Sequence, residues 1–218
     1  MKVETVVVVA GGHLSTGCVP ELPEGAYVIA ADSGVDRALA LGLRIDRAIG
    51  DFDSVSPGGL AEADAAGAVV ERHPTAKDAT DLELALDAAI ALEPSRILVI
   101  GSATGRLDHL LGSILLLGDA RYASATVDAY LDDNRITVIR GSRTLTGTAG
   151  EIVSLLPLHS PAEDVMTSGL EYPLHGETLP AGTTRGVSNV FAASEAHVAV
   201  TRGCLIAVQP GPERAASS

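Results

Sequence analysis

The first 130 residues alternate short apolar runs with segments of helical periodicity, and this alternation narrows the possible folds more than any other feature of the chain. Apolar runs of strand length lie at 3–10, 26–31, 47–50, 68–71, 96–100 and 125–131. Helical patterns lie at 36–43, 57–67, 80–92 and 107–119. The pattern at 80–92 is the firmest, because Thr80 and Glu83 form a capping box before leucines and alanines at helical spacing. Strands joined by such helices predict a parallel sheet covered on both faces.

After Asp132 and Asp133 the pattern changes to short strand-like runs separated by glycine, proline and serine. These runs lie at 135–140, 151–156, 164–167, 186–191, 196–201 and 205–209. Their spacing predicts a small all-β sandwich or barrel without helices. We therefore expect an α/β chain: a parallel-sheet α/β domain at 1–130, a smaller all-β sandwich domain at 131–210 and a disordered tail at 211–218.

The charge balance limits the classes of partner. Lysine and arginine together number 15 and aspartate and glutamate 28, a formal net charge of −13, which has the wrong sign for a nucleic-acid binder. An acidic chain attracts divalent cations where its carboxylates converge. No apolar stretch approaches the roughly 18 residues needed to span a bilayer, so we expect no membrane association. Cys18 and Cys204 fit no metal-ligand spacing and are expected as thiols in a reducing, cytoplasmic compartment.

Several carboxylates follow the predicted strands directly. In an open parallel sheet the ligand crevice lies beyond the carboxyl ends of the strands, so acids at those ends should meet. Such a cluster repels itself unless cations are present, and Mg²⁺ is the natural counter-ion for oxygen ligands. The acids at strand ends are Asp32, Asp51, Asp53 and Asp108, and Asp78 and Asp81 flank the start of the helix at 80–92.

Each of these residues also has an ordinary structural interpretation. Asp81 could simply complement the helix dipole, and Asp32 could be a turn former. A functional role is favoured for Asp51 and Asp53, because two acids one residue apart converge only in a tight loop. Asp108 is either a helix-start acid or, with Arg106, part of a polyphosphate site, and Lys77 is either a phosphate contact or a solvated lysine.

The common nucleotide and zinc motifs are missing. The segment 12–18 imitates a P-loop but has Cys18 where lysine is required, and no dinucleotide-binding glycine motif follows a strand. The six histidines include no pair at metal-binding spacing, so zinc is not expected.

The chain resembles the thiamine pyrophosphokinase family in six segments, which are AADSGVDRALALG, IGDFDSV, KDATDLELAL, GSATGRLDH, GLEYPL and TRGVSN. They occur in the family's order and cover nearly the whole chain. The resemblance implies an ATP-binding α/β domain and a thiamine-binding β-sandwich that also dimerises. It further implies a homodimer with active sites at the subunit interface, and Mg²⁺-dependent transfer of pyrophosphate from ATP to the thiamine hydroxyl, releasing thiamine diphosphate and AMP.

The resemblance also implies roles for individual residues. Asp51, Asp53 and Asp81 are expected to act in catalysis, and together with Asp78 to hold the metal. Residues expected at the ATP site are Asp32, Lys77, Thr80, Arg106 and Asp108, and those at the thiamine pocket are Tyr172, Ser188 and Asn189. Ser188 and Asn189 alone would be interpreted as a turn between strands. The chain departs from the family pattern in two ways. In the first motif, Ser33 and Asp36 stand where the family pattern has glycine and asparagine. The chain also has no tryptophan that could stack on thiamine.

Two other functions compete with this one. DFDS is similar to the nucleophile motif of haloacid dehalogenase-type phosphatases, but that motif should follow the first strand, whereas here it follows roughly the third. A non-catalytic sensor of a nucleotide or vitamin would need the same pocket without turnover.

Overall fold

The computed structural model describes residues 3–12 and 21–211, so Cys18 and most of the predicted tail lie outside the described residues. The chain divides into two compact units. The first holds the residues up to Leu116 together with Arg121–Asp132, and the second holds Leu117–Ala120 together with the residues from Asp133 onward. The main change of unit falls two residues beyond the expected boundary at 130. The brief excursion at Leu117–Ala120 was not expected.

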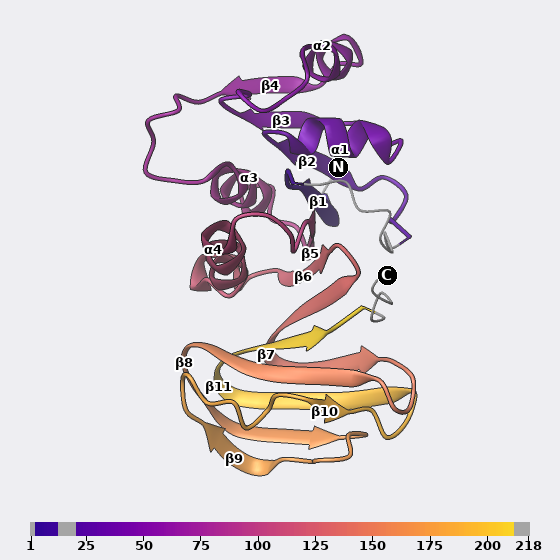
Figure 1. The fold of residues 1–218 in the computed structure, drawn as a ribbon, viewed down its shortest axis with the longest axis vertical. Coiled ribbons are helices and arrows are strands. Elements are labelled where there is room, and N and C mark those ends of the chain that lie inside the picture. Colours follow the sequence, from indigo (N-terminus) through magenta and orange to yellow (C-terminus); the bar gives the residue numbers. More distant parts are fainter. Residues whose placement is uncertain (1–2, 13–20, 212–218) are drawn as a thin grey trace, which may run out of the picture. The chain divides into compact units, whose positions relative to one another are not determined.

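The first unit contains a parallel sheet with the strand order β6-β5-β1-β2-β3-β4 (Figure 1). All five pairings between these strands are parallel, as the alternation of strands and helices predicts. The central strand is fully buried, which explains its unbroken run of valines. The strands are β1 (Thr5–Val9), β2 (Tyr27–Ala31), β3 (Arg47–Gly50), β4 (Val69–Arg72), β5 (Arg96–Gly101) and β6 (Thr126–Leu131).

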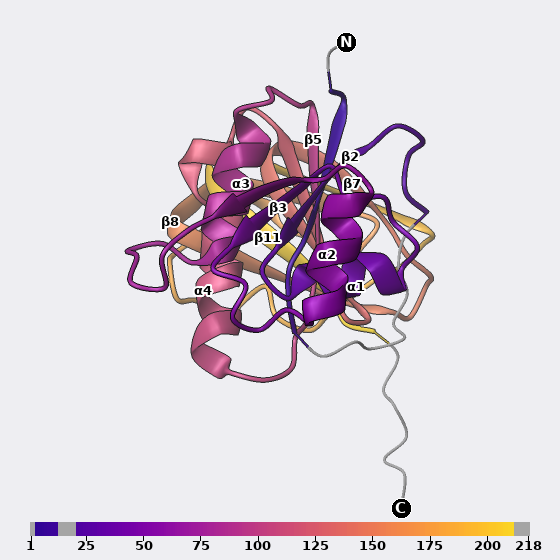
Figure 2. The same cartoon turned by 90° about the horizontal axis from the view of Figure 1, so that it is seen from above.

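Helices cover both faces of this sheet, with α1 and α2 on one side and α3 and α4 on the other (Figure 2). They are α1 (Gly34–Ala40), α2 (Pro57–Ala65), α3 (Asp81–Ile90) and α4 (Leu107–Leu117), followed by the short 3-10 turn η1 (Ala120–Tyr122). Helix α1 begins two residues before the predicted start at 36, because the amide of Val35 already donates to the Asp32 carbonyl and closes a turn directly after β2. Within the described residues, no helix is both long and apolar enough to cross a bilayer.

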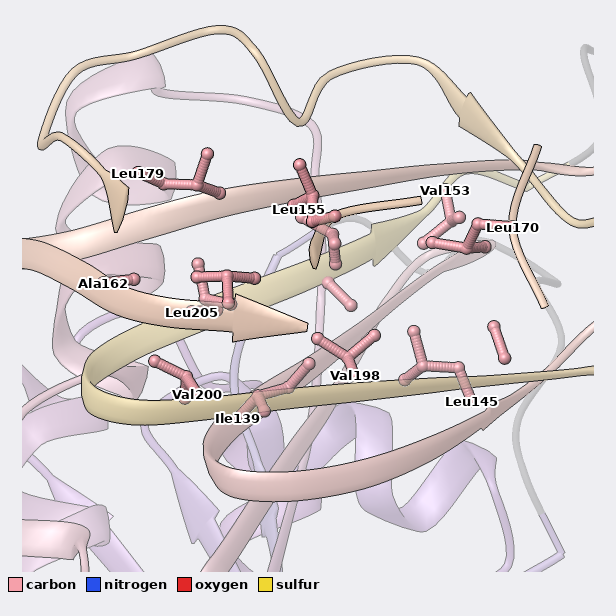
Figure 3. Packing of buried hydrophobic residues seen from close by; sticks show 14 of the residues in the cluster. Ile139, Leu145, Val153, Leu155, Ala162, Leu170, Leu179, Val198, Val200 and Leu205 are labelled. Carbon is pink, nitrogen blue, oxygen red and sulfur yellow. The ribbon is translucent and has the colours of Figure 1, made fainter. Parts of the chain in front are cut away.

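From Asp133 to 211 the second unit contains strands and no helix, and its strand pairings are antiparallel, with the strand order β10-β8-β11-β7 and β9 paired to β8. Its strands are β7 (Asn134–Thr146), β8 (Ile152–Ser168), β9 (His175–Leu179), β10 (Asn189–Val190) and β11 (Glu195–Gln209). Its apolar core, which includes Leu155, Val198 and Leu205, lies between strands that pass on either side of it (Figure 3). Cys204 on β11 is buried with a free thiol, and burial raises the pKa of that thiol.

The predicted strand boundaries of the second unit were wrong in several places. The runs at 151–156 and 164–167 belong to the single strand β8, and those at 196–201 and 205–209 belong to β11. Gly203 has φ 94° inside β11, where the register shifts, and a Cβ there would overlap the Pro161 carbonyl oxygen. Glycine and proline therefore mark bulges within long strands, and the sequence pattern cannot distinguish a bulge from a turn. Strand β9 was missed, and only Asn189–Val190 of the run at 186–191 is a strand.

Candidate active site

Three carboxylates meet at the carboxyl ends of the neighbouring strands β2 and β3. Asp32 follows β2 directly and Asp51 follows β3 directly, and the Asp32 amide donates to the Ile49 carbonyl at 2.8 Å. Carboxylate oxygens of Asp32, Asp51 and Asp53 all lie within 4.8 Å of one another. The parallel sheet thus brings together acids that are about twenty residues apart in sequence, as the rule for strand ends predicts.

The loop after β3 is bent so that its two acids join the same group. Phe52 has φ 60°, in the left-handed region, and this breaks the extended geometry that would send Asp51 and Asp53 to opposite sides. Such a conformation costs about 1–3 kcal/mol and persists only when surrounding packing holds it. Phe52 is buried in the apolar core beside α1 and α2, and the Arg72 guanidinium lies over its ring at 5.2 Å. Gly50 has φ 153°, and a Cβ there would lie 3.2 Å from the Asp32 backbone.

Lys77 joins a fourth acid to this group. Its Nζ donates to Asp51 Oδ2 at 3.3 Å and lies 3.2 Å from Oδ1 of Asp81, the first residue of α3. Burial alone would lower the pKa of Lys77, but its contacts with Asp81 and Asp51 outweigh burial and raise it. Lys77 is therefore a charged partner within the cluster and not a solvated surface lysine.

The electrostatics of the cluster favour a bound cation. Burial raises the pKa of Asp32, and the negative charges of Asp81, Asp51 and Asp53 raise it further. Burial would also raise the pKa of Asp51, but hydrogen bonds from the Asp53 amide and the Lys77 ammonium outweigh it and lower that pKa. Asp32 Oδ1 is buried and accepts no hydrogen bond from the described residues. A set of hard oxygen donors with one buried oxygen left without a partner fits Mg²⁺.

The other predicted residues near α3 have different surroundings. Asp78 is exposed and lies outside the three-carboxylate group. Thr80 is the N-cap of α3, where its hydroxyl accepts from the Glu83 amide at 3.2 Å. The Glu83 carboxylate pairs with Arg121 at 2.8 Å. The capping interaction of Thr80 is thus present, and it accounts for this residue without a ligand.

Arg106 and Asp108, after β5, pair with each other. Arg106 donates from Nε at 3.2 Å and from Nη2 at 2.6 Å to the two oxygens of Asp108. This hydrogen bonding is the main reason that the pKa of Asp108 falls to about 2. Both side chains are exposed, so the guanidinium remains accessible to an anion while the carboxylate orients it.

Sequence reasoning missed Asp132, which organises the loops beside this site. Its Oδ2 accepts from the Ala103 amide at 2.8 Å and from the Ser102 hydroxyl at 3.1 Å, and its Oδ1 lies 3.7 Å from the buried Arg37 guanidinium. Arg37 also donates to the Ala10 carbonyl after β1 at 3.5 Å. The available signal was the position of Asp132 directly after β6, the same placement that identified Asp32 and Asp51.

The unusual Asp36 in the first motif has a structural role. Its carboxylate accepts from the Ser56 amide at 2.8 Å and from the Ser56 hydroxyl at 2.6 Å. Ser56 is the N-cap of α2, so Asp36 connects α1 to the start of α2.

The residues predicted for thiamine lie in the second unit. Both ends of the buried Asn189 amide hold the Tyr172 backbone: Oδ1 accepts from the Tyr172 amide at 3.1 Å and Nδ2 donates to its carbonyl at 2.8 Å. Tyr172 is 65% exposed. Ser188 is exposed with φ 58°, and its amide donates to the Ser154 hydroxyl. Asn189 therefore positions the segment that carries an accessible aromatic ring.

Comparison with family models and solved structures agrees with this arrangement. Residues 21–129 match the model of the thiamin pyrophosphokinase catalytic domain, and residues 135–205 match that of the thiamin pyrophosphokinase vitamin B1 binding domain. The thiamine pyrophosphokinase of Bacillus subtilis strain 168 is 28% identical over an alignment of 212 residues that covers 94% of this chain and 98% of that protein.

Solved structures give the same result. A crystal structure of thiamine pyrophosphokinase from Bacillus subtilis aligns with a TM-score of 0.83 at 27% identity, covering 96% of this chain and all of that one. A thiamin pyrophosphokinase family protein from Enterococcus faecalis aligns with a TM-score of 0.82 at 25% identity, covering 97% of this chain and all of that one. Because both units match domains of one enzyme, in the same order and over nearly the whole length, this mixed α/β chain belongs to the thiamine pyrophosphokinase family and is a transferase, a thiamine diphosphokinase.

Proposed function

We propose that this chain transfers pyrophosphate from ATP to the hydroxyl of thiamine in a Mg²⁺-dependent reaction that gives thiamine diphosphate and AMP. The observation that carries the proposal is the convergence of Asp32, Asp51 and Asp53, whose oxygens lie within 4.8 Å of one another. Three carboxylates can hold Mg²⁺ and leave its other positions for water and phosphate oxygens. The acidic surroundings also suit thiamine, which carries a fixed positive charge.

In the proposed reaction the thiamine oxygen attacks the β-phosphorus of ATP, and the bond from that phosphorus to the bridging oxygen of AMP breaks. The hydroxyl proton leaves to a nearby base. Bound Mg²⁺ neutralises charge on the polyphosphate and helps to orient it. Asp32, Asp51 and Asp53 would hold that ion, and Asp81 would support Asp51 through Lys77, which contacts both acids. Metal roles for Asp78 and Asp81 stay predictions, as do a catalytic role for Asp81 and a contact of Asp32 with ATP.

The remaining residues bind and orient the substrates. Lys77 and Arg106 are the cationic side chains that we assign to the polyphosphate, with Asp108 orienting Arg106 and Thr80 fixing the start of α3. Tyr172 supplies the aromatic surface that we assign to thiamine, held in place by Asn189, with Ser188 beside it in sequence. Tyrosine can stack on the cationic thiazolium ring, so tryptophan is not required.

We also propose a homodimer with active sites at the subunit interface. Helix α4 offers a surface for the second copy, because Leu107, Leu111 and Leu115 lie on one face at spacings of four residues and are 67%, 52% and 49% exposed. A cytoplasmic location fits the free, buried thiol of Cys204 and the need for ATP.

Identification of the nucleotide product tests the proposed reaction. Purified protein is incubated with ATP, MgCl₂ and thiamine, and the products are separated by chromatography. We expect AMP and thiamine diphosphate in equal amounts. ADP or free phosphate would indicate a phosphotransferase or phosphatase, and binding of both substrates without turnover would indicate a sensor. The phosphatase alternative is already disfavoured by position, since the acid pair follows β3 and not β1.

A further inference from the structure

Lys77 lies between Asp51, an acid of the candidate metal site, and Asp81, the first residue of α3. Its side chain is 14% exposed and contacts Asp51, itself 12% exposed, and Asp81. Lys2 and Lys77 are the only lysines among the 15 basic residues; all the others are arginines. An ammonium is a compact point charge on a flexible stem, whereas a guanidinium is a broad planar fork. At this position Lys77 therefore resembles a small cation more closely than an arginine would.

The Asp51 carboxylate can interact with two cations, the Lys77 ammonium and a bound Mg²⁺. Asp51 belongs to the three carboxylates that converge, and it is also the hydrogen-bond acceptor of Lys77. Four acids lie close enough to interact, because the negative charges of Asp81, Asp51 and Asp53 all raise the pKa of Asp32. The single ammonium offsets about a quarter of that charge. A divalent ion that takes Asp51 as a ligand must therefore weaken the contact between Asp51 and Lys77, because the ion and the ammonium are both positive and would repel each other beside the same carboxylate.

We propose that Lys77 is a built-in counter-ion of Asp51 and Asp81 that competes with Mg²⁺ for Asp51, so that free Mg²⁺ binds weakly and Mg²⁺ with a nucleoside polyphosphate binds strongly. The ammonium released from the acids passes to a phosphate oxygen, which its four-carbon stem allows. Lys77 acts as a positioning residue: it keeps the acids neutralised and ties metal binding to nucleotide binding. The nucleotide part rests on the proposed function, whereas the competition for metal does not.

Metal titration tests the competition without any turnover. Isothermal titration calorimetry with MgCl₂ alone, on the full chain, compares the unaltered protein with Lys77→Met, which keeps the length of the stem and removes the charge. We expect Lys77→Met to bind Mg²⁺ at least about tenfold more tightly, because a repelling unit charge a few ångströms away is gone. Lys77→Arg keeps the charge and should bind free Mg²⁺ as weakly as the unaltered protein.

A matched control separates local from global charge. Arg202→Gln removes one positive charge from the second unit, where Arg202 is exposed and pairs with Glu163 at 3.5 Å. It should leave Mg²⁺ affinity unchanged within about twofold. If Lys77→Met and Arg202→Gln tighten Mg²⁺ binding equally, the effect is that of net charge and the proposal is wrong.

A second titration tests the coupling, with Mg²⁺ added in the presence of α,β-methylene-ATP, which cannot release AMP. The unaltered protein should gain Mg²⁺ affinity from the analogue, and Lys77→Met should gain at least about tenfold less, having lost the phosphate contact. Unchanged or weaker binding of free Mg²⁺ by Lys77→Met, including no binding by either protein, would overturn the competition. Circular dichroism checks folding, and Lys77→Gln replaces Lys77→Met if the latter does not fold.

The two proposals fail separately. If thiamine diphosphate is not formed but Lys77→Met tightens Mg²⁺ binding, the proposed reaction is wrong and the competition stands. If the products are as expected but the affinities of both proteins for free Mg²⁺ are equal, the reaction stands and Lys77 is only a phosphate contact.

Discussion

The backbone conformation around each carboxylate of the site determines where that carboxylate points. The positive φ of Phe52 turns Asp53 toward Asp51, and the buried Phe52 ring holds that turn against the apolar core. The Ser54 hydroxyl then donates to Asp53 Oδ1 at 2.7 Å and limits its rotation. Asp53 is exposed, whereas Asp51 and Asp32 are half-buried, so Asp53 is the acid of the group that can change with least effect on folding.

Replacing Asp53 by asparagine should therefore separate catalysis from stability. We expect Asp53→Asn to lose at least about 100-fold in kcat for thiamine diphosphate formation, because one anionic ligand is lost at the polyphosphate. The melting temperature should stay within about 2 °C, as for other surface substitutions. Asp64→Asn, at an exposed carboxylate on α2, is the matched control and should keep full activity. Near-normal turnover by Asp53→Asn would remove this residue from the metal site.

Tyr172 gives a second test at this scale, directed at thiamine. Removing its ring in Tyr172→Ala should raise KM for thiamine by about tenfold, since a cation–π contact is worth about 1–2 kcal/mol. KM for ATP should not change. Tyr172→Phe keeps the aromatic face and should behave like the unaltered protein, because Asn189 holds the backbone and not the phenol. Equal KM values for thiamine in all three proteins would place thiamine elsewhere.

Helix α4 exposes an apolar face. A surface helix usually packs such a face against the core, yet Leu107, Leu111 and Leu115 are exposed. Only Leu117 at the end of the helix is fully buried. An exposed apolar helix face is typical of a surface that a second copy covers.

The oligomeric state of a charged variant tests this surface. Leu111→Glu should weaken the dimer by at least about 100-fold, because the carboxylate would be buried without a partner. Light scattering coupled to size-exclusion chromatography measures the mass of each species. Val69→Glu, at an exposed apolar residue on β4, should remain dimeric. The interface would have to lie elsewhere if Leu111→Glu had the same mass as the unaltered protein, and an active monomer would contradict a shared site.

At the scale of the molecule, a buried ion pair in the first unit joins several loops. Arg37 on α1 and Asp132 after β6 have side chains only 5% and 10% exposed. Between them they contact the loops after β1 and β5 through Ala10, Ser102 and Ala103. Segments from 10 to 132 are therefore connected by two charged side chains at the carboxyl ends of the strands.

Breaking this pair should destabilise the unit far more than breaking an exposed pair. Asp132→Ala leaves the Arg37 charge buried, which we expect to lower the free energy of unfolding by about 3 kcal/mol. Glu163→Ala, which removes the exposed partner of Arg202, should cost less than about 1 kcal/mol. Urea unfolding followed by circular dichroism measures both. A loss as small as that of Glu163→Ala would mean that Asp132 is held for a reason other than this ion pair.

Much of the fold follows from local patterns. Alternating strand and helix periods predict the parallel sheet, because each period reports which face of an element is buried, and Arg47–Gly50 was located to the residue. Acids directly after strands could be assigned to one edge, because parallel strands all end there. In the second unit the predicted strand boundaries were wrong, because Gly203 and the prolines of β8 lie inside long strands and not in turns between strands.

The finer arrangement of the site depends on contacts between residues far apart in the chain. The meeting of Asp32 with Asp51 and Asp53 needs the left-handed Phe52, and the partner of Lys77 is set by how the segment before α3 returns to β3. Asn189 holds Tyr172 across 17 residues, and Asp132 bonds Ala103 across 29. Residue types and periodicity indicate which side chains a protein can use, whereas distances of a few ångströms depend on loop dihedrals and strand register, which only the packed chain specifies.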